Sequence, residues 1–165
     1  MKFTNKKKII IATGGTGGHI FPAYSLAKNF IKNNYAVEII TDERGLKYLD
    51  KHNGIKLNLN NSATIFKKNI VNLFLSVFVI FFSYIKSLVI LYKANPSVVF
   101  GMGGHASFPV CIAAKTLNIP FIIYENNIQI GRSNKYLLPF AFKIFVSYRD
   151  LFGIENKHDH KVVVT

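Results

Sequence analysis

Short runs rich in β-branched and aromatic residues alternate with stretches of helical length along this chain. Such runs predict strands, and strict alternation of strand and helix requires right-handed crossovers, which produce a parallel sheet covered on both faces. We therefore predict an α/β fold that binds its ligands at the carboxyl ends of the strands. The seven predicted strands are Ile9–Ala12, Ala36–Thr41, Ile55–Leu59, Ser97–Phe100, Phe121–Tyr124, Lys143–Ser147 and Lys161–Thr165.

Four stretches between these strands have the length and composition of helices, and a fifth has room for a short one. The four are Pro22–Asn33, Ile65–Lys93, Phe108–Leu117 and Gly131–Ala141, and the short one lies in Asp42–Lys51. No internal repeat or Pro/Gly-rich linker divides the 165 residues, so we predict one domain over residues 1–165. The chain stops directly after a run that resembles a strand entering a loop, and we expect a further domain beyond Thr165.

The chain is strongly basic, with 21 Lys and Arg against eight Asp and Glu and a formal net charge of +13. This charge favours an anionic partner: a phosphate-bearing ligand, an acidic membrane or nucleic acid. Only Arg44, Arg132 and Arg149 are arginines, whereas base-reading proteins depend on arginine forks, so we do not expect a nucleic-acid partner. A compositional preference for lysine on a solvated surface is the alternative explanation.

Cysteine usage and the N-terminus indicate a cytoplasmic protein. Cys111 is the single cysteine and lies in the apolar run Pro109–Ala114, which excludes an intrachain disulfide and predicts a buried thiol. The apolar run Ile9–Ala12 behind the N-terminal lysines is too short for a signal peptide. His158 and His160 resemble surface residues, and no set of His, Cys and carboxylate residues has metal-ligand spacing, so no metal site is expected.

A glycine-rich loop, Thr13–His19, follows the first predicted strand and precedes Pro22 and a helix. Glycines let the backbone approach a ligand closely, and the amides at a helix start favour an anion, so the loop is a candidate phosphate or sugar site. A tight structural turn is the alternative. The dinucleotide-binding fingerprint requires a third glycine where Ile20 stands, and the Walker pattern requires a lysine that the loop lacks.

Three ordered motifs carry a family resemblance that covers nearly the whole chain. They are Gly14–Ala23, then Val98–Gly104 followed by Pro109 and Ile112–Ala114, then Ile119–Pro120 leading to Glu125–Asn127, Gly131 and Asn134–Lys135. The sequence resembles the N-terminal domain of the MurG family, bacterial transferases that complete lipid II. The chain departs from the usual family pattern at His105, Asn126 and Ile128, where Tyr, Gln and Gly are common.

The resemblance implies a GT-B glycosyltransferase, in which two Rossmann-like domains face each other across a cleft and no metal or other cofactor is needed. It implies inverting transfer of N-acetylglucosamine from UDP-N-acetylglucosamine to lipid I, the undecaprenyl-pyrophosphoryl-muramoyl peptide, in peptidoglycan synthesis. In the family the N-terminal domain binds this acceptor at the cytoplasmic face of the plasma membrane, as part of a peripheral protein. The donor sits mostly on the C-terminal domain, so the 165-residue chain alone is expected to be inactive.

Several residues in the three motifs are candidates for the site. His19 stands at a helix start, where the dipole disfavours a positive charge; the resemblance makes it a candidate general base, with a loop-ordering histidine as the alternative. Asn127 matches a donor-contacting asparagine of the family, with a turn-stabilising role as the alternative. Glu125 either contacts substrate or orders its loop by accepting backbone amides. The other substrate-binding candidates are Thr16, Gly17 and Gly18 at the donor, Gly103 and Gly104 at the acceptor diphosphate, and Asn134.

The uncharged stretch Asn69–Ile85 is rich in phenylalanine and is flanked by lysines. A spanning helix needs about 20 apolar residues, and polar residues interrupt this stretch, so we prefer an amphipathic helix that is part core and part membrane interface. An anionic membrane surface is then the partner of its lysines. An ordinary core helix and a true span are the alternatives. The phenylalanines are Phe74, Phe78, Phe81 and Phe82, and the lysines are Lys67, Lys68, Lys86 and Lys93.

Two other functions are open from the sequence. One is a stand-alone, membrane-docking subunit that binds the acceptor and recruits a separate catalytic chain. The weaker one is a nucleotide-dependent oxidoreductase, which the residue at Ile20 argues against because it breaks the dinucleotide pattern.

Overall fold

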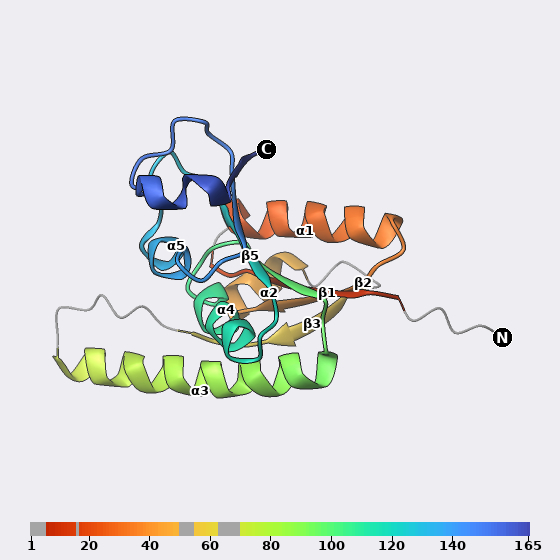
Figure 1. Cartoon of the computed structure of the whole chain (residues 1–165). Coiled ribbons are helices and arrows are strands. Elements are labelled where there is room, and N and C mark those ends of the chain that lie inside the picture. Colours follow the sequence, from red (N-terminus) through yellow and green to blue (C-terminus); the bar gives the residue numbers. More distant parts are fainter. Residues whose placement is uncertain (1–5, 16, 50–54, 63–69) are drawn as a thin grey trace.

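Seven parallel strands form the centre of the computed structural model, which describes residues 6–15, 17–49, 55–62 and 70–165 (Figure 1). Their order in the sheet is β3-β2-β1-β4-β5-β6-β7, and every neighbouring pair is parallel. The α/β prediction is therefore confirmed, and the strand ends lie within about one residue of the predicted ones. The strands are β1 (Lys8–Ala12), β2 (Ala36–Thr41), β3 (Lys56–Leu59), β4 (Val98–Gly101), β5 (Phe121–Glu125), β6 (Lys143–Val146) and β7 (Val162–Val164).

Helices cover both faces of the sheet, and alternate residues of the central strand β1 point to the two layers. The helices are α1 (Gly17–Lys32), α2 (Glu43–Leu49), α3 (Ile70–Ala94), α4 (Ser107–Thr116) and α5 (Arg132–Leu137), with a 3-10 helix, η1 (Asn156–Lys161), before β7. Ile9 and Ile11 belong to the core under α1 and α2, whereas Ile10 and Ala12 belong to the core under α3, α4 and α5. Figure 1 shows α1 and α3 on opposite sides of the sheet.

The first helix begins earlier than its sequence predicts. Glycine has a low helix propensity, which argues for a start at Pro22, yet α1 begins at Gly17. The missing side chain of Gly17 makes room for the ring of Phe21 one turn later, because a Cβ atom there would lie 2.8 Å from Phe21 Cε2. A contact between side-chain positions one turn apart thus accompanies the early start of this helix.

The fifth helix is shorter than predicted, and η1 was not predicted at all. α5 ends at Leu137 rather than Ala141, since Pro139 has no amide hydrogen with which to continue the helix. Residues 65–69 of the predicted third helix, and residues 50–51 of the predicted short helix, lie outside the described residues.

The long helix α3 packs with its polar side inward. Ser76, Ser83 and Ser87 are buried, and Asn60, which follows β3, donates hydrogen bonds to the Ser83 carbonyl (3.1 Å) and to Ser87 Oγ (2.8 Å). Its segment Phe74–Ala94, with a mean hydropathy of 2.3, is able to cross a membrane by length and composition alone. The exposed side of the helix carries Phe74, Leu75, Val77, Phe78, Phe81, Phe82, Ile85, Val89 and Tyr92.

The single cysteine lies in the core, as predicted. Cys111 on α4 is completely buried beneath Gly101, where a Cβ atom would come 2.6 Å from the Cys111 Sγ. Burial raises the pKa of this thiol to about 12, because the apolar surroundings disfavour the thiolate.

The chain reverses its direction across the sheet at β1. It runs outward from β1 to β2 and β3 and then returns to place β4 on the other side of β1. In doubly wound sheets such a reversal opens a crevice beyond the carboxyl ends of the two strands, and ligands bind there.

Candidate functional site

A pocket of about 320 Å³ lies beyond the carboxyl ends of β1, β4 and β5, at the reversal point of the sheet. Three segments build it: the first turn of α1, the loop between β4 and α4, and the segment from β5 into α5. Six of the predicted site residues line it: His19, Gly103, Gly104, Glu125, Asn127 and Asn134.

The two glycine loops touch each other backbone to backbone. Gly104 has φ of +78° and lies so close to Gly14 that a Cβ atom on Gly104 would overlap the Gly14 carbonyl oxygen. Gly14 in turn lies against Ala106. Gly103, with φ of +90°, packs against the imidazole of His19, since a Cβ atom there would lie 2.7 Å from His19 Nδ1. The left-handed backbone and the close contacts both require glycine at these two positions.

His19 lies in the first turn of α1 and lines the pocket. Its Nδ1 is buried, and no described residue provides it with a hydrogen-bond partner. Buried polar atoms are normally satisfied, so the unmet hydrogen-bonding capacity of this nitrogen sets it apart in the described part of the chain. An imidazole in this position is able either to hold a sugar hydroxyl or to accept its proton.

A proline inside α1 connects the first glycine loop to the end of β5. Pro22 has no amide hydrogen, so the carbonyl of Gly18, four residues earlier, receives no helical hydrogen bond from it. Asn126, directly after β5, donates its Nδ2 to that carbonyl at 3.1 Å. The start of α1 is thereby fixed against the third segment of the pocket.

Glu125 orders the segment between β5 and α5. Its buried carboxylate accepts hydrogen bonds from the Asn127 amide (3.1 Å) and Nδ2 (2.6 Å), the Gly131 amide (2.8 Å) and Asn134 Nδ2 (3.0 Å). The same Asn134 Nδ2 also donates to the Tyr124 carbonyl (2.9 Å). Asn134 Oδ1 is buried without a partner among the described residues, so its hydrogen-bonding capacity is unmet there.

A corner between β2 and α2 supports the first glycine loop. Asp42 Oδ1 accepts the amides of Gly15 (3.1 Å) and Gly45 (2.9 Å), and Oδ2 accepts Nε (3.2 Å) and Nη2 (2.9 Å) of Arg44. Burial by itself raises the pKa of Asp42, but the two amides and the guanidinium outweigh it and hold that pKa below its usual value. Asp42 is therefore a carboxylate at neutral pH.

His105 lies at the rim of the pocket, near Arg44. Partial burial of its ring lowers the pKa of His105, and the positive charge of Arg44 lowers it further, while Asp42 raises it. The balance favours a neutral ring near pH 7.

Not every residue of this region was predicted. Gly17 and Gly18 lie beside the pocket at the start of α1, and Thr16 lies outside the described residues. The lining also includes Arg132 and Ser133, which carried no signal in the sequence beyond their place at a predicted helix start. In the described part of the chain, no group of three or more His, Cys, Asp or Glu residues is arranged to hold a metal ion.

Curated relatives of this chain are named transferases. Residues 9–146 match the model of the glycosyltransferase family 28 N-terminal domain. A relative from Rickettsia felis is 38% identical over 159 residues, which are 96% of this chain and 43% of the relative. Its name is UDP-N-acetylglucosamine–N-acetylmuramyl-(pentapeptide) pyrophosphoryl-undecaprenol N-acetylglucosamine transferase. The chain therefore spans less than half the length of this relative.

Solved structures agree with the fold. MurG from Acinetobacter baumannii matches with a TM-score of 0.80 and 24% identity, over 96% of this chain and 45% of that one. A glycosyltransferase from Rickettsia africae matches with a TM-score of 0.71 and 22% identity, over 97% of this chain and 42% of that one. At these identities the likeness concerns the Rossmann-like fold alone. Because the family model matches most of its length, the chain belongs to glycosyltransferase family 28, as an N-terminal domain of that family.

Proposed function

We propose that this chain is the acceptor-binding domain of an inverting N-acetylglucosaminyltransferase that converts lipid I to lipid II. In this reaction the 4-hydroxyl of the muramoyl sugar attacks C1 of N-acetylglucosamine, and UDP leaves from the opposite face. The observation that carries the proposal is a pocket, in a family 28 domain, where a histidine, two left-handed glycines and a carboxylate-ordered loop meet. The name of the Rickettsia felis relative supports UDP-N-acetylglucosamine and lipid I as the substrates.

The candidate residues divide the work in this proposal, and the role of Glu125 is to order the loop that carries Asn127. His19 accepts the proton of the attacking hydroxyl, which general-base catalysis makes worth about 100-fold or more in rate. The amides of Gly103–Gly104, at the carboxyl edge of β4, cradle the acceptor diphosphate. Thr16–Gly18 and Asn127 contact the donor, and Asn134 Oδ1 accepts a substrate hydrogen bond. The proposal includes no metal ion or cofactor.

The proposal also has the domain dock on the cytoplasmic face of the plasma membrane through the exposed side of α3. That side offers aromatic and aliphatic side chains, and the exposed Lys86 and Lys93 on the same helix attract anionic headgroups. A spanning helix is disfavoured, because Leu91 on the inner side belongs to the core and Asn60 is bonded to the helix. We therefore propose a peripheral protein.

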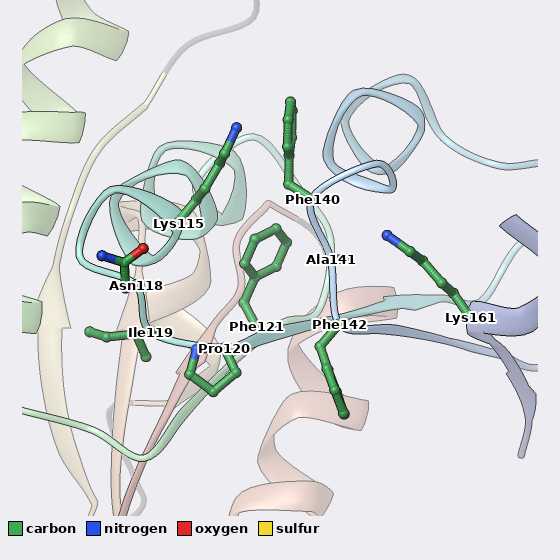
Figure 2. Close-up of a pocket in the computed structure, with 9 residues that line it drawn as sticks. All are labelled: Lys115, Asn118, Ile119, Pro120, Phe121, Phe140, Ala141, Phe142 and Lys161. Atoms are coloured by element: carbon green, nitrogen blue, oxygen red, sulfur yellow. The ribbon is translucent and has the colours of Figure 1, made fainter.

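We propose that a hollow of about 510 Å³ between the end of α4, the start of β5 and the segment after α5 adds to this docking surface (Figure 2). Thr116 at the end of α4 is hydrogen-bonded to Tyr84 of α3 (3.0 Å). The neighbouring Lys115 places its Nζ 3.1 Å from the centre of the Phe140 ring, and Phe142, which is 64% exposed, also lines the hollow. Lysines beside exposed aromatic rings suit the boundary between headgroups and acyl chains.

The transferase proposal is tested by supplying the C-terminal part of a relative that this chain does not cover. UDP-N-acetylglucosamine and lipid I are given to three samples: the 165-residue chain alone, the chain mixed with the C-terminal half of the Rickettsia felis relative, and the chain fused to that half. We expect no product from the chain alone and lipid II from the fused protein. Product from the chain alone contradicts the two-domain arrangement. A fused protein that binds both substrates and forms no product contradicts the proposed reaction. Product from the unfused mixture but not from the fused protein favours a separate docking subunit.

A further inference from the structure

Arg44 is held at the point where the two glycine loops meet. The carboxylate of Asp42 uses one oxygen to hold the Gly15 amide and the other to hold the Arg44 guanidinium, so a single buried group fixes both. The Asp42 side chain is 7% exposed and the Arg44 side chain is 61% exposed. The pair therefore has an inner, negative end inside the fold and an outer, positive end at its surface.

This guanidinium lies beside the first loop and within electrostatic reach of His105, the residue after the second loop. A Cβ atom built on Gly15 would lie 3.9 Å from Arg44 Nη2, so the guanidinium lies directly beside the first loop. Arg44 is also close enough to His105, which follows the second loop, to affect its charge. A guanidinium has five N–H donors, and in the described part of the chain Arg44 directs two of them to Asp42.

The choice of arginine here is informative. The chain has 21 basic residues, and all but three are lysines. A planar fork that remains charged and binds two oxygens at once suits a phosphate better than a lysine does, and anchoring the fork in advance reduces the entropy lost on binding.

We propose that Arg44 binds the diphosphate of the lipid-linked acceptor, together with the glycine-loop amides, and that Asp42 is the positioning residue that aims it. This inference rests on the proposed function, because that function supplies a diphosphate-bearing substrate. The diphosphate is negatively charged, and the loop amides offset that charge only partly because they carry no full positive charge. The guanidinium supplies a full positive charge where the two loops meet.

The test uses inorganic pyrophosphate as the probe and the 165-residue chain as the protein. Binding is measured by calorimetry, and amide shifts of Gly15, Gly103 and Gly104 in NMR spectra locate the probe. We expect Arg44→Gln to weaken binding by about 10-fold to 100-fold, as for loss of a charged hydrogen-bond partner, with the melting temperature nearly unchanged. Arg44→Lys retains a charge without the fork and is expected to fall between. Arg149→Gln removes the same charge from an exposed position outside the pocket and is the matched control.

The outcomes separate this inference from the function on which it rests. Binding that is equally strong in wild type and Arg44→Gln overturns the role of Arg44 and leaves the glycine-loop site standing. Absence of pyrophosphate binding in the wild type overturns both. If Asp42 acts through Arg44, Asp42→Asn weakens pyrophosphate binding when Arg44 is present. In the Arg44→Gln background the same substitution causes at most about a twofold further loss of affinity. Equal losses from Asp42→Asn in both backgrounds overturn the positioning role.

Discussion

Replacing two exposed rings of α3 is expected to release the protein from membranes. Phe78 and Phe82 are 57% and 66% exposed and therefore contribute little to the core. Burying a whole phenylalanine side chain in an apolar phase is worth about 1.5 to 3 kcal/mol. Applied to the exposed fractions of both rings, this gives about 2 to 4 kcal/mol of membrane affinity, or about 30-fold to 800-fold in partitioning.

The assay is sedimentation with vesicles that contain anionic lipid, for the wild type and for Phe78→Ser/Phe82→Ser. Phe152→Ser is the matched control, because Phe152 is 64% exposed but lies between β6 and η1, away from α3. The double variant should keep the wild-type melting temperature, and raising the salt concentration should weaken the binding of both proteins through their lysines. Unchanged partitioning of Phe78→Ser/Phe82→Ser, or an equal loss in Phe152→Ser, refutes docking through this side of the helix.

Four further outcomes are expected. In the fused enzyme, His19→Ala should lower turnover by about 100-fold or more with donor affinity nearly unchanged, and full activity with an unaltered pH profile in His19→Gln would exclude a base. Glu38→Gln should lower the free energy of unfolding, measured with urea at pH 7, by about 1 to 2 kcal/mol. Burial raises the pKa of Glu38, but its hydrogen bonds and lysine partners outweigh burial and hold that pKa below the usual 4.5, so the loss should shrink as the pH falls below 4.5. A loss that does not depend on pH contradicts this ion-pair account. Native Cys111 should resist alkylation at pH 8 and react after unfolding in urea, so rapid labelling of the folded chain would disprove its burial. In Arg44→Gln, the pKa of His105 measured by NMR should rise, because a neighbouring positive charge is removed, and an unchanged value places Arg44 elsewhere.

The layers and order of elements were predictable because periodicity and β-branched composition are local properties. The two boundaries that failed have local causes that periodicity alone does not weigh: the Phe21 ring lies over Gly17 one turn earlier in α1, and Pro139 ends α5 inside the run predicted as helix. The inward serines of α3 were also outside the reach of pattern reasoning. Hydrophobic periodicity assigns apolar side chains to the core, whereas Ser83 and Ser87 are held inside by Asn60.

The site was predictable where its residues follow strands in glycine-rich motifs, since parallel strands end at one edge of the sheet. The corner of Asp42 and Arg44 was missed because its contact to Gly15 joins two separate strand ends, and the only local signal was a carboxylate at a helix start. The bond from Asn126 to Gly18 was missed for a similar reason. It depends on Pro22 leaving a carbonyl free, which becomes meaningful only when β5 is placed beside α1.

The position of α3 between the two partners of β1 has a consequence for synthesis. β1 pairs with β2 on one side and with β4 on the other, Ile9 opposite Val98, so the ribosome completes α3 before β1 obtains its second neighbour. The exposed side of α3 gains no burial when the sheet closes, so under the proposed docking it is available to a bilayer in the nascent chain as well as in the finished fold. We expect ribosomes translating the region after α3 to be found already at the membrane.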